Sequence, residues 1–226
     1  MNGQLLVFDM DGVLVDVTES YRETIQRTVE HFSGRCVTRP EIQDWKNHGG
    51  WNDDWALSHA LIREAGVEVE YQSVVDYFNS IFHGNGTDGL ILRERWIARD
   101  GLFERLSRNF QLAVFTGRLH WEAELTLRRC APALRFAPII GTDDVTEPKP
   151  APEGLLRICN QSCARRQWYI GDTVDDARCA REAGVPFIGI ASPANPRYHE
   201  LVKVLKAEKA VAILDDINQL EPVVSA

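Results

Sequence analysis

Two aspartates stand two positions apart directly after a short apolar run near the start of the chain. The run is Leu5–Phe8, and Asp9 and Asp11 follow it in the stretch FDMDGVLVD. Side chains two residues apart on an extended chain point to the same side. Two carboxyl groups in one place can share a reaction, one as the nucleophile and the other as the proton carrier. The pair therefore predicts covalent catalysis at the end of a strand.

Later apolar runs also lead into polar residues. Thr116 ends one run in FTGR, Asp172 ends another in GDTVDD, and Lys149 in EPKPAP follows a third. Open parallel sheets bind ligands beyond the carboxyl ends of their strands, so we expect these side chains to converge. The Thr116 hydroxyl, neighbouring backbone N–H groups such as that of Gly117, and the Lys149 ammonium could hold phosphoryl oxygens. Arg118 could reach a substrate anion there, or it could be a solvated residue of the next helix.

The carboxylates of this set need a cation. Asp9, Asp11, Asp172 and Asp176 would repel one another if all stayed ionised at one sheet edge. Their oxygen ligands, with no His or Cys beside them, favour Mg²⁺ over zinc. With Mg²⁺ bound, one carboxylate could attack phosphorus and form an aspartyl-phosphate. The simpler alternative for Asp172 is a cap on the helix that starts near Val174.

The hydrophobic pattern predicts the elements that position these residues. Near-continuous apolar runs suit strands buried on both faces. The predicted strands are Leu5–Phe8, Leu112–Phe115, Phe136–Ile140, Trp168–Ile170, Pro186–Ile190 and Val211–Leu214. Segments with helical spacing lie between the later runs, so the pattern predicts an α/β fold, a Rossmann-like parallel sheet with helices on both faces.

One interval, residues 17–87, breaks this alternation and shows helical patterns without a convincing strand. The starts of its helices are marked by cap residues: Ser20 with Glu23, Thr38 before Pro40, and Asn52 or Asp53. We predict a small all-helical cap domain. The expected boundaries are residues 1–16 and 88–226 for a discontinuous α/β core and 17–87 for the cap.

Composition limits the classes of partner. The chain has 226 residues, 44% of them hydrophobic, and a formal net charge of −8 without a basic block. This balance disfavours nucleic acid and anionic membranes and leaves small molecules as partners. No apolar stretch is long enough for a membrane span and no signal-peptide pattern is present, so we expect a cytoplasmic location. The five cysteines lack paired spacing and are expected to be reduced thiols, and nothing indicates an oligomeric state.

The stretches FDMDGVLVD, FTGR, EPKPAP and GDTVDDARCAREAG resemble, in order, the four signature motifs of the haloacid dehalogenase-like (HAD) hydrolases. The resemblance is to the branch with a helical cap inserted after the first strand, which contains phosphoglycolate phosphatases and beta-phosphoglucomutases. The motifs span residues 8–184, and together with the predicted cap they account for nearly the whole chain. Four motifs in the same order are far more specific than any one of them.

The resemblance implies a role for each matching residue. It makes Asp9 the nucleophile and Asp11 the general acid and base, with the Asp11 backbone carbonyl on Mg²⁺. The other matching residues are Thr116 and Lys149 at phosphate-binding positions, Asp172 as metal ligand, and Asp176 as the second acid of its motif. Relatives often carry Asn or another polar residue at the position of Asp175, which leaves its role open.

The main functional hypothesis is a Mg²⁺-dependent phosphatase that hydrolyses a small phosphorylated metabolite through an aspartyl-phosphate. A phosphomutase of the beta-phosphoglucomutase type is the alternative, because spacing does not reveal how long the aspartyl-phosphate lasts. A phospho-accepting signalling domain would be about half as long and lack a cap, and a non-catalytic binding protein would not need every motif position. Dehalogenases of this family lack an acid at the position of Asp11.

The substrate is not indicated by the motifs. Selectivity would depend on the predicted cap, where the loop 47–55 joins two helices. In similar proteins such loops face the active site and sort substrates. Trp51 and Trp55 could line a substrate pocket, or they could pack in the small core of the cap.

Overall fold

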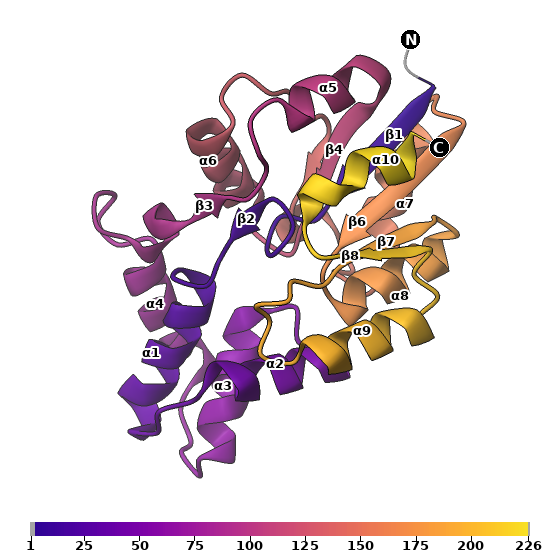
Figure 1. Ribbon diagram of the computed structural model, residues 1–226. Coiled ribbons are helices and arrows are strands. Elements are labelled where there is room, and N and C mark those ends of the chain that lie inside the picture. Colours follow the sequence, from indigo (N-terminus) through magenta and orange to yellow (C-terminus); the bar gives the residue numbers. More distant parts are fainter. Residues whose placement is uncertain (1–2, 226) are drawn as a thin grey trace. The chain divides into compact units, whose positions relative to one another are not determined.

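The computed structural model describes residues 3–225 (Figure 1). These residues form two compact units. One unit combines the chain up to Val15 with the chain from Trp96 onward, and the other is the continuous segment Asp16–Arg95. The first is an α/β unit and the second is helical, and each is described by itself.

The α/β unit is built on a six-stranded sheet whose described pairs are all parallel. The strands follow the predicted runs: β1 (Gln4–Phe8), β4 (Gln111–Phe115), β5 (Ile139–Ile140), β6 (Arg166–Gly171), β7 (Phe187–Ile190) and β8 (Ala212–Leu214). Their spatial order is β5-β4-β1-β6-β7-β8. β1 therefore lies between β4 and β6, and the strand ends that carry Asp9, Thr116 and Asp172 are neighbours.

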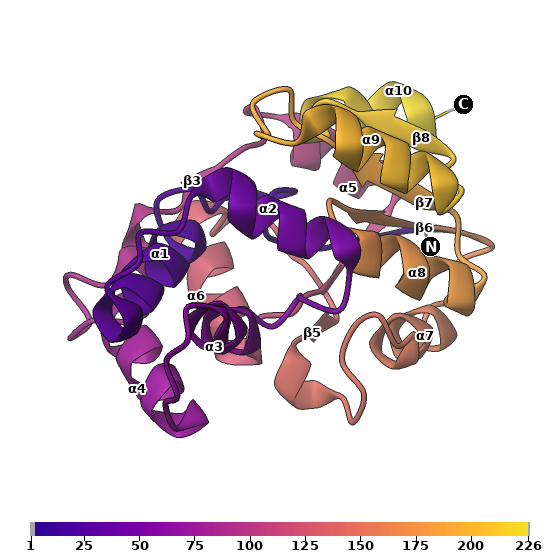
Figure 2. The same ribbon diagram turned by 90° about the horizontal axis from the view of Figure 1, so that it is seen from below.

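Helices cover both faces of this sheet, which confirms the predicted fold class (Figure 2). On one face, Leu5 and Val7 belong to a buried cluster shared with α7, α8 and α9. On the other face, the Phe8 ring packs edge-on against Phe103 of α5, with 5.4 Å between ring centroids. The helices of this unit are α5 (Leu102–Asn109), α6 (His120–Cys130), α7 (Glu153–Gln161), α8 (Val174–Ala183), α9 (Tyr198–Ala207) and α10 (Leu220–Val224), with short 3-10 turns η2 (Thr142–Asp144) and η3 (Ile217–Gln219).

One strand is shorter than predicted. The apolar run 136–140 yields only Ile139–Ile140 as strand β5. Pro138 has no N–H to donate to a neighbouring strand, and proline is confined to the ends and edges of sheets. The run still lies beside β4 from Ala137 on, because the Ala137 N–H donates to the Leu112 carbonyl at 2.7 Å and the Pro138 carbonyl accepts the Val114 N–H at 3.0 Å.

The helical unit contains α1 (Tyr21–Ser33), α2 (Arg39–His48), α3 (Asp54–Glu64), α4 (Tyr71–Phe82) and the 3-10 turn η1 (Leu90–Arg93). Two predicted helix starts are confirmed. Thr38 forms a capping box with Glu41, and the Asp53 carboxylate accepts the backbone N–H groups of Trp55 and Ala56. Buried apolar residues from three of the helices make its core, among them Ile25, Val29, Leu57, Leu61, Val74 and Phe78.

The predicted capping box at Ser20 and Glu23 is wrong. Ser20 precedes α1, but its side chain makes no cap hydrogen bond. Its hydroxyl instead donates to Glu94 Oε1 at 3.3 Å, and Glu23 pairs with Arg27 one turn along the helix at 2.7 Å. Both side chains of the expected box are therefore engaged elsewhere.

The helical unit extends beyond the predicted boundary at residue 87. The structure ends it at Arg95, because Leu90 and Ile91 of η1 are buried and η1 packs against α1 and α4. The chain passes between the units in two short strands, β2 (Val15–Asp16) and β3 (Arg95–Trp96), which form a two-stranded sheet. That the helical unit serves as a cap stays a prediction.

The tryptophans of the loop 47–55 have partners inside the helical unit. The Trp51 ring lies edge-on to Trp45, with centroids 4.6 Å apart. Trp55 donates its indole N–H to Asn79 at 3.1 Å. These contacts agree with the packing alternative, and a role of the loop in selectivity stays a prediction.

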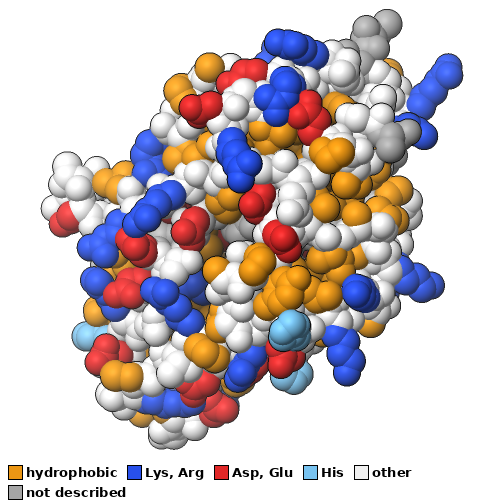
Figure 3. Space-filling view, in the orientation of Figure 1, with side chains coloured by type: hydrophobic (Ala, Val, Ile, Leu, Met, Phe, Trp, Pro, Cys, Tyr) orange, Lys and Arg blue, Asp and Glu red, His pale blue; other side chains and the backbone are white. Residues whose placement is uncertain are grey.

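On the face seen in Figure 3, Lys and Arg side chains are interspersed with Asp and Glu side chains. Within residues 3–225, no helix combines the length and the apolar composition needed to cross a membrane.

Candidate active site

Three neighbouring strand ends bring the predicted residues together. Phe8, the last residue of β1, pairs with Val114 of β4 and Ile170 of β6, so these strands end at nearly the same level. The Asp9 N–H donates to the Ile170 carbonyl at 2.8 Å, which extends β1 by one bond. Asp9, Thr116 and Asp172 therefore follow directly on the strands of one unit.

The turn after β1 depends on a glycine. Gly12 has a φ of 72°, in the left-handed region that favours glycine. A Cβ at this position would lie only 2.2 Å from Asp172 Oδ2. Only a glycine thus lets the turn that carries Asp11 approach the carboxylate at the end of β6.

Lys149 links two of the acids. Its Nζ lies 2.8 Å from Asp9 Oδ1 and 2.7 Å from Asp176 Oδ1, and all three side chains are buried. The ammonium also lies over the rings of Phe115 and Tyr169, at 5.0 and 5.3 Å from the centroids. A lysine from the loop before α7 is therefore fixed between the first strand and α8.

Two residues that sequence reasoning missed hold Asp176. The Tyr169 hydroxyl donates to Asp176 Oδ1 at 2.7 Å, and Thr173 donates its backbone N–H and hydroxyl to Oδ2 at 3.1 and 2.6 Å. Thr173 is the N-cap of α8, and its Oγ1 accepts the Asp176 N–H at 3.1 Å. The spacing of Thr173 and Asp176 is that of a capping box and could have revealed this pair. No local pattern distinguishes Tyr169 from the other apolar residues of β6.

Burial and charge set the protonation of this group. Burial raises the pKa of Asp9 to about 7; the Lys149 charge opposes this shift, and the nearby Asp176 and Asp11 reinforce it. Burial also acts on Asp176, but the Lys149 charge and the hydrogen bonds from Lys149, Thr173 and Tyr169 outweigh it and lower the Asp176 pKa. Burial opposes the charged form of Lys149, yet the Asp176 and Asp9 carboxylates raise its pKa. Lys149 and Asp176 thus form an ion pair.

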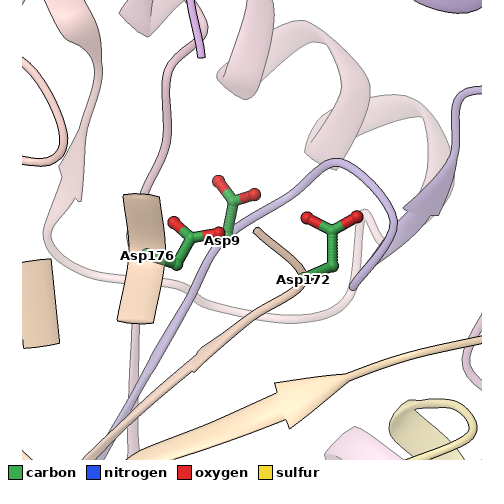
Figure 4. Close-up of side chains that lie close together, drawn as sticks. All are labelled: Asp9, Asp172 and Asp176. Atoms are coloured by element: carbon green, nitrogen blue, oxygen red, sulfur yellow. The ribbon is translucent and has the colours of Figure 1, made fainter. Parts of the chain in front are cut away.

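Three of the predicted acids form a candidate metal site. Asp9, Asp172 and Asp176 each offer a carboxylate oxygen, and these oxygens lie within 4.8 Å of one another (Figure 4). A set made only of oxygen donors fits a hard cation such as Mg²⁺. The group contains three of the four predicted metal ligands. The fourth, Asp11, is predicted to bind through its backbone carbonyl, which stays a prediction; its carboxyl group contacts Arg118.

The remaining predicted residues lie around this group. The Thr116 hydroxyl oxygen accepts the Arg118 backbone N–H at 3.3 Å, and Gly117 lies between them in the turn from β4 to α6. Arg118 is buried and contacts Asp11, with Nε 2.6 Å from Oδ1. This burial excludes the solvated alternative for Arg118. Asp175 is buried in the first turn of α8, and its role stays open.

Known proteins match the chain over most of its length. The family model described as haloacid dehalogenase-like hydrolase matches residues 6–190. An imidazoleglycerol-phosphate dehydratase of Phytophthora nicotianae is 33% identical over 201 residues, which cover 84% of this chain but only 44% of that protein. A phosphoglycolate phosphatase of Pseudomonas putida is 21% identical over 97% of the chain and 79% of its own length. The solved structure of phosphatase Tt82 from Thermococcus thioreducens superposes with a TM-score of 0.66 at 26% identity, over 89% of this chain and 99% of the other.

The chain belongs to the haloacid dehalogenase-like hydrolase family. The resemblance of its four motifs is thereby confirmed, and the predicted class of phosphoric monoester hydrolases is supported by the phosphatases among its relatives. The chain spans less than half of the dehydratase that it matches.

Proposed function

We propose that the protein is a Mg²⁺-dependent phosphatase that hydrolyses a small phosphorylated metabolite through an aspartyl-phosphate on Asp9. The observation that carries this proposal is the buried contact of Lys149 with Asp9 and Asp176 at the end of the central strand. It fixes a carboxylate and a cation next to each other, where a phosphoryl group would meet both.

The proposed first step transfers the phosphoryl group to the enzyme. A carboxylate oxygen of Asp9 attacks phosphorus and the ester P–O bond breaks. The leaving oxygen takes a proton from Asp11, which stands two residues further along the chain. This step yields the free alcohol, the aspartyl-phosphate and an ionised Asp11.

The second step returns the enzyme to its starting state. Asp11 takes a proton from a water molecule, whose oxygen attacks phosphorus and displaces the Asp9 carboxylate. Inorganic phosphate leaves, and Asp11 again holds a proton. Throughout, the Thr116 hydroxyl, the Gly117 backbone N–H and the Lys149 ammonium would hold the phosphoryl oxygens, whose charge needs fixed donors.

The metal would be held by Asp9, Asp172, Asp176 and the Asp11 backbone carbonyl. Bound there, Mg²⁺ supplies positive charge that offsets the carboxylates and the phosphate dianion. Asp176 already accepts hydrogen bonds on both oxygens, so we expect it to contribute less directly than Asp9 and Asp172.

The test of this function is phosphate release from p-nitrophenyl phosphate. We expect activity with Mg²⁺ that stops on addition of EDTA and returns with excess Mg²⁺, and an Asp9→Asn variant that folds but does not turn over. Equal rates in EDTA would contradict the metal assignment. Substantial activity of the Asp9→Asn variant would move the nucleophile elsewhere.

A substrate panel would then find the metabolite. The names of the relatives suggest phosphoglycolate and imidazoleglycerol phosphate as first members. Beta-glucose 1-phosphate belongs in the panel because it separates a mutase, which yields a second sugar phosphate, from a phosphatase, which releases phosphate. The cytoplasmic location stays a prediction.

A further inference from the structure

Arg118 is a buried cation that contacts the carboxyl group of Asp11. Its side chain is 1% exposed, and Nε and Nη2 lie 2.6 and 2.5 Å from the same oxygen, Asp11 Oδ1. A buried charge is tolerated only with such partners. A residue at the end of β4 therefore contacts the proposed proton carrier at the end of β1.

The fold fixes the direction of this guanidinium from its other side. Nη1 donates to Thr126 Oγ1 of α6 at 3.1 Å, and Thr126 is fully buried. The backbone N–H of Arg118 donates to Thr116 Oγ1 at 3.3 Å. Because the guanidinium is planar and rigid, fixing one nitrogen sets the directions of the others. Arg118 is thus aimed at Asp11 by α6.

Asp11 is the acid that needs such a contact. Its side chain is 30% exposed, whereas that of Asp9 is 5% exposed and is held by Lys149. A short side chain beside water has several accessible rotamers. Contact of both nitrogens with Oδ1 restricts the carboxyl group and leaves Oδ2 as the oxygen that exchanges a proton.

We infer that Arg118 is a positioning residue that holds Asp11 for proton transfer to the leaving oxygen, and not a ligand of the substrate. This inference rests on the proposed function, in which Asp11 carries that proton. If Arg118 positions the acid, the loss of activity on replacing Arg118 depends on the leaving group. A substrate ligand would affect all phosphate esters alike.

The experiment compares Arg118→Met with the natural protein on esters of different leaving groups. Methionine retains the apolar stem and removes the charge and the donors. For alkyl phosphates, whose leaving oxygen needs a proton, we expect kcat/KM to fall by about 10- to 100-fold. For p-nitrophenyl phosphate, a stable leaving group, we expect a fall of less than about 3-fold and a nearly unchanged KM. Arg118→Lys should lie between the two proteins, because it retains the charge without the planar fork.

Two further variants make the comparison specific. In an Asp11→Asn background, Arg118→Met should add little to the leaving-group effect, since its target is already lost. Arg128→Met removes an exposed arginine of α6 that pairs only with the neighbouring Glu124 in the described contacts, and it should leave the profile unchanged. Thermal unfolding of each variant identifies any that fail to fold.

Equal losses for all leaving groups, or a large rise in KM, would overturn the inference and make Arg118 a substrate ligand. A crystal structure of the Arg118→Met variant tests the inference without an activity assay. We expect the Asp11 carboxyl group to turn away from its present position, and an unmoved carboxyl group would overturn the inference. Absence of any phosphate release by the natural protein would instead contradict the proposed function.

Discussion

At the scale of single residues, the site depends on a few buried charges that neutralise one another. Lys149 stands between Asp9 and Asp176, and Arg118 stands against Asp11. Burial makes such pairs sensitive to the loss of one partner, since the remaining charge is left without compensation. Stability and the proposed catalysis would therefore depend on the same side chains.

Replacing Lys149 tests whether one side chain supports both stability and the proposed catalysis. Lys149→Met should lower the free energy of unfolding by about 3 to 5 kcal/mol, because it leaves the Asp9 and Asp176 carboxyl groups buried without their cation. It should also reduce phosphatase activity at least about 100-fold through the loss of a phosphoryl-oxygen donor. Urea denaturation and p-nitrophenyl phosphate hydrolysis measure the two effects. The control is Lys203→Met on an exposed position of α9, and an equally small change in both variants would contradict the role of Lys149.

The positions of the site residues at strand ends could be predicted from the sequence, whereas most of their side-chain partners could not. Asp9 and Thr116 could be placed because each directly follows an apolar run, and Asp172 because a single glycine separates it from one. The contact of Arg118 with Asp11 joins residues 107 positions apart and depends on how a long side chain is buried. Tyr169 is a similar case, because its hydroxyl finds Asp176 only once α8 packs on β6. Such contacts are set by packing, which no local pattern contains.

At the scale of elements, turns and helix starts decide where these side chains lie. Thr38 and Asp53 cap their helices as predicted, whereas Ser20 does not, because a distant glutamate, Glu94, takes its hydroxyl. Capping signals are local, and a tertiary contact can override them.

The turn after β1 gives a prediction with an internal control. Gly12→Ala places a methyl group 2.2 Å from Asp172 Oδ2 and also disfavours the φ of 72°. Gly34→Ala at the end of α1 has a similar φ of 68°, but apart from its chain neighbours no atom of residues 3–225 lies within 4 Å of its new Cβ. We expect Gly34→Ala to cost about 1 kcal/mol of stability. Gly12→Ala should cost clearly more and should also weaken Mg²⁺-dependent activity, and equal effects in the two variants would contradict the close approach to Asp172.

The loop that leads to Lys149 is tied to α6 by a titratable contact. His120 Nδ1 lies 2.6 Å from Asp144 Oδ2 of η2, and this hydrogen bond, together with the charges of Asp144, Glu124 and Asp143, raises the pKa of His120. A raised pKa in the folded state means that the contribution to stability is complete below pH 6.5, the ordinary value, and is lost as the pH rises through the folded-state pKa.

The expected outcome is a loss of stability with rising pH that depends on His120. Thermal unfolding of the natural protein and of His120→Gln, measured between about pH 5 and pH 9, isolates this contribution. The difference in melting temperature between the two proteins should be largest at acidic pH and shrink toward alkaline pH. A difference that is independent of pH would show that the imidazole charge does not act in this contact.

At the scale of the whole molecule, the candidate site residues all belong to the α/β unit, although its chain is interrupted by the helical unit. The family model covers residues 6–190 and so includes the whole helical unit and the α/β unit up to Ile190. The fold class could be predicted because it follows from periodicity along the chain, and the order of motifs because it resembles that of the haloacid dehalogenase-like hydrolases. The end of the helical unit at Arg95 could not, because it depends on η1 packing against α1 and α4.

This division leads to a prediction about the metal. Mg²⁺ bound by Asp9, Asp172 and Asp176 would stabilise only the folded α/β unit, by about 3 kcal/mol at a concentration 100 times the dissociation constant. Calorimetry should therefore show a rise in melting temperature with Mg²⁺ for the natural protein and a much smaller rise for Asp172→Asn. Where the two units melt in separate transitions, only the transition of the α/β unit should shift. NaCl at the same ionic strength controls for screening of the net charge of −8. An equal shift in both proteins would place the effect of Mg²⁺ outside this site, because Asp172 would then contribute nothing to its binding.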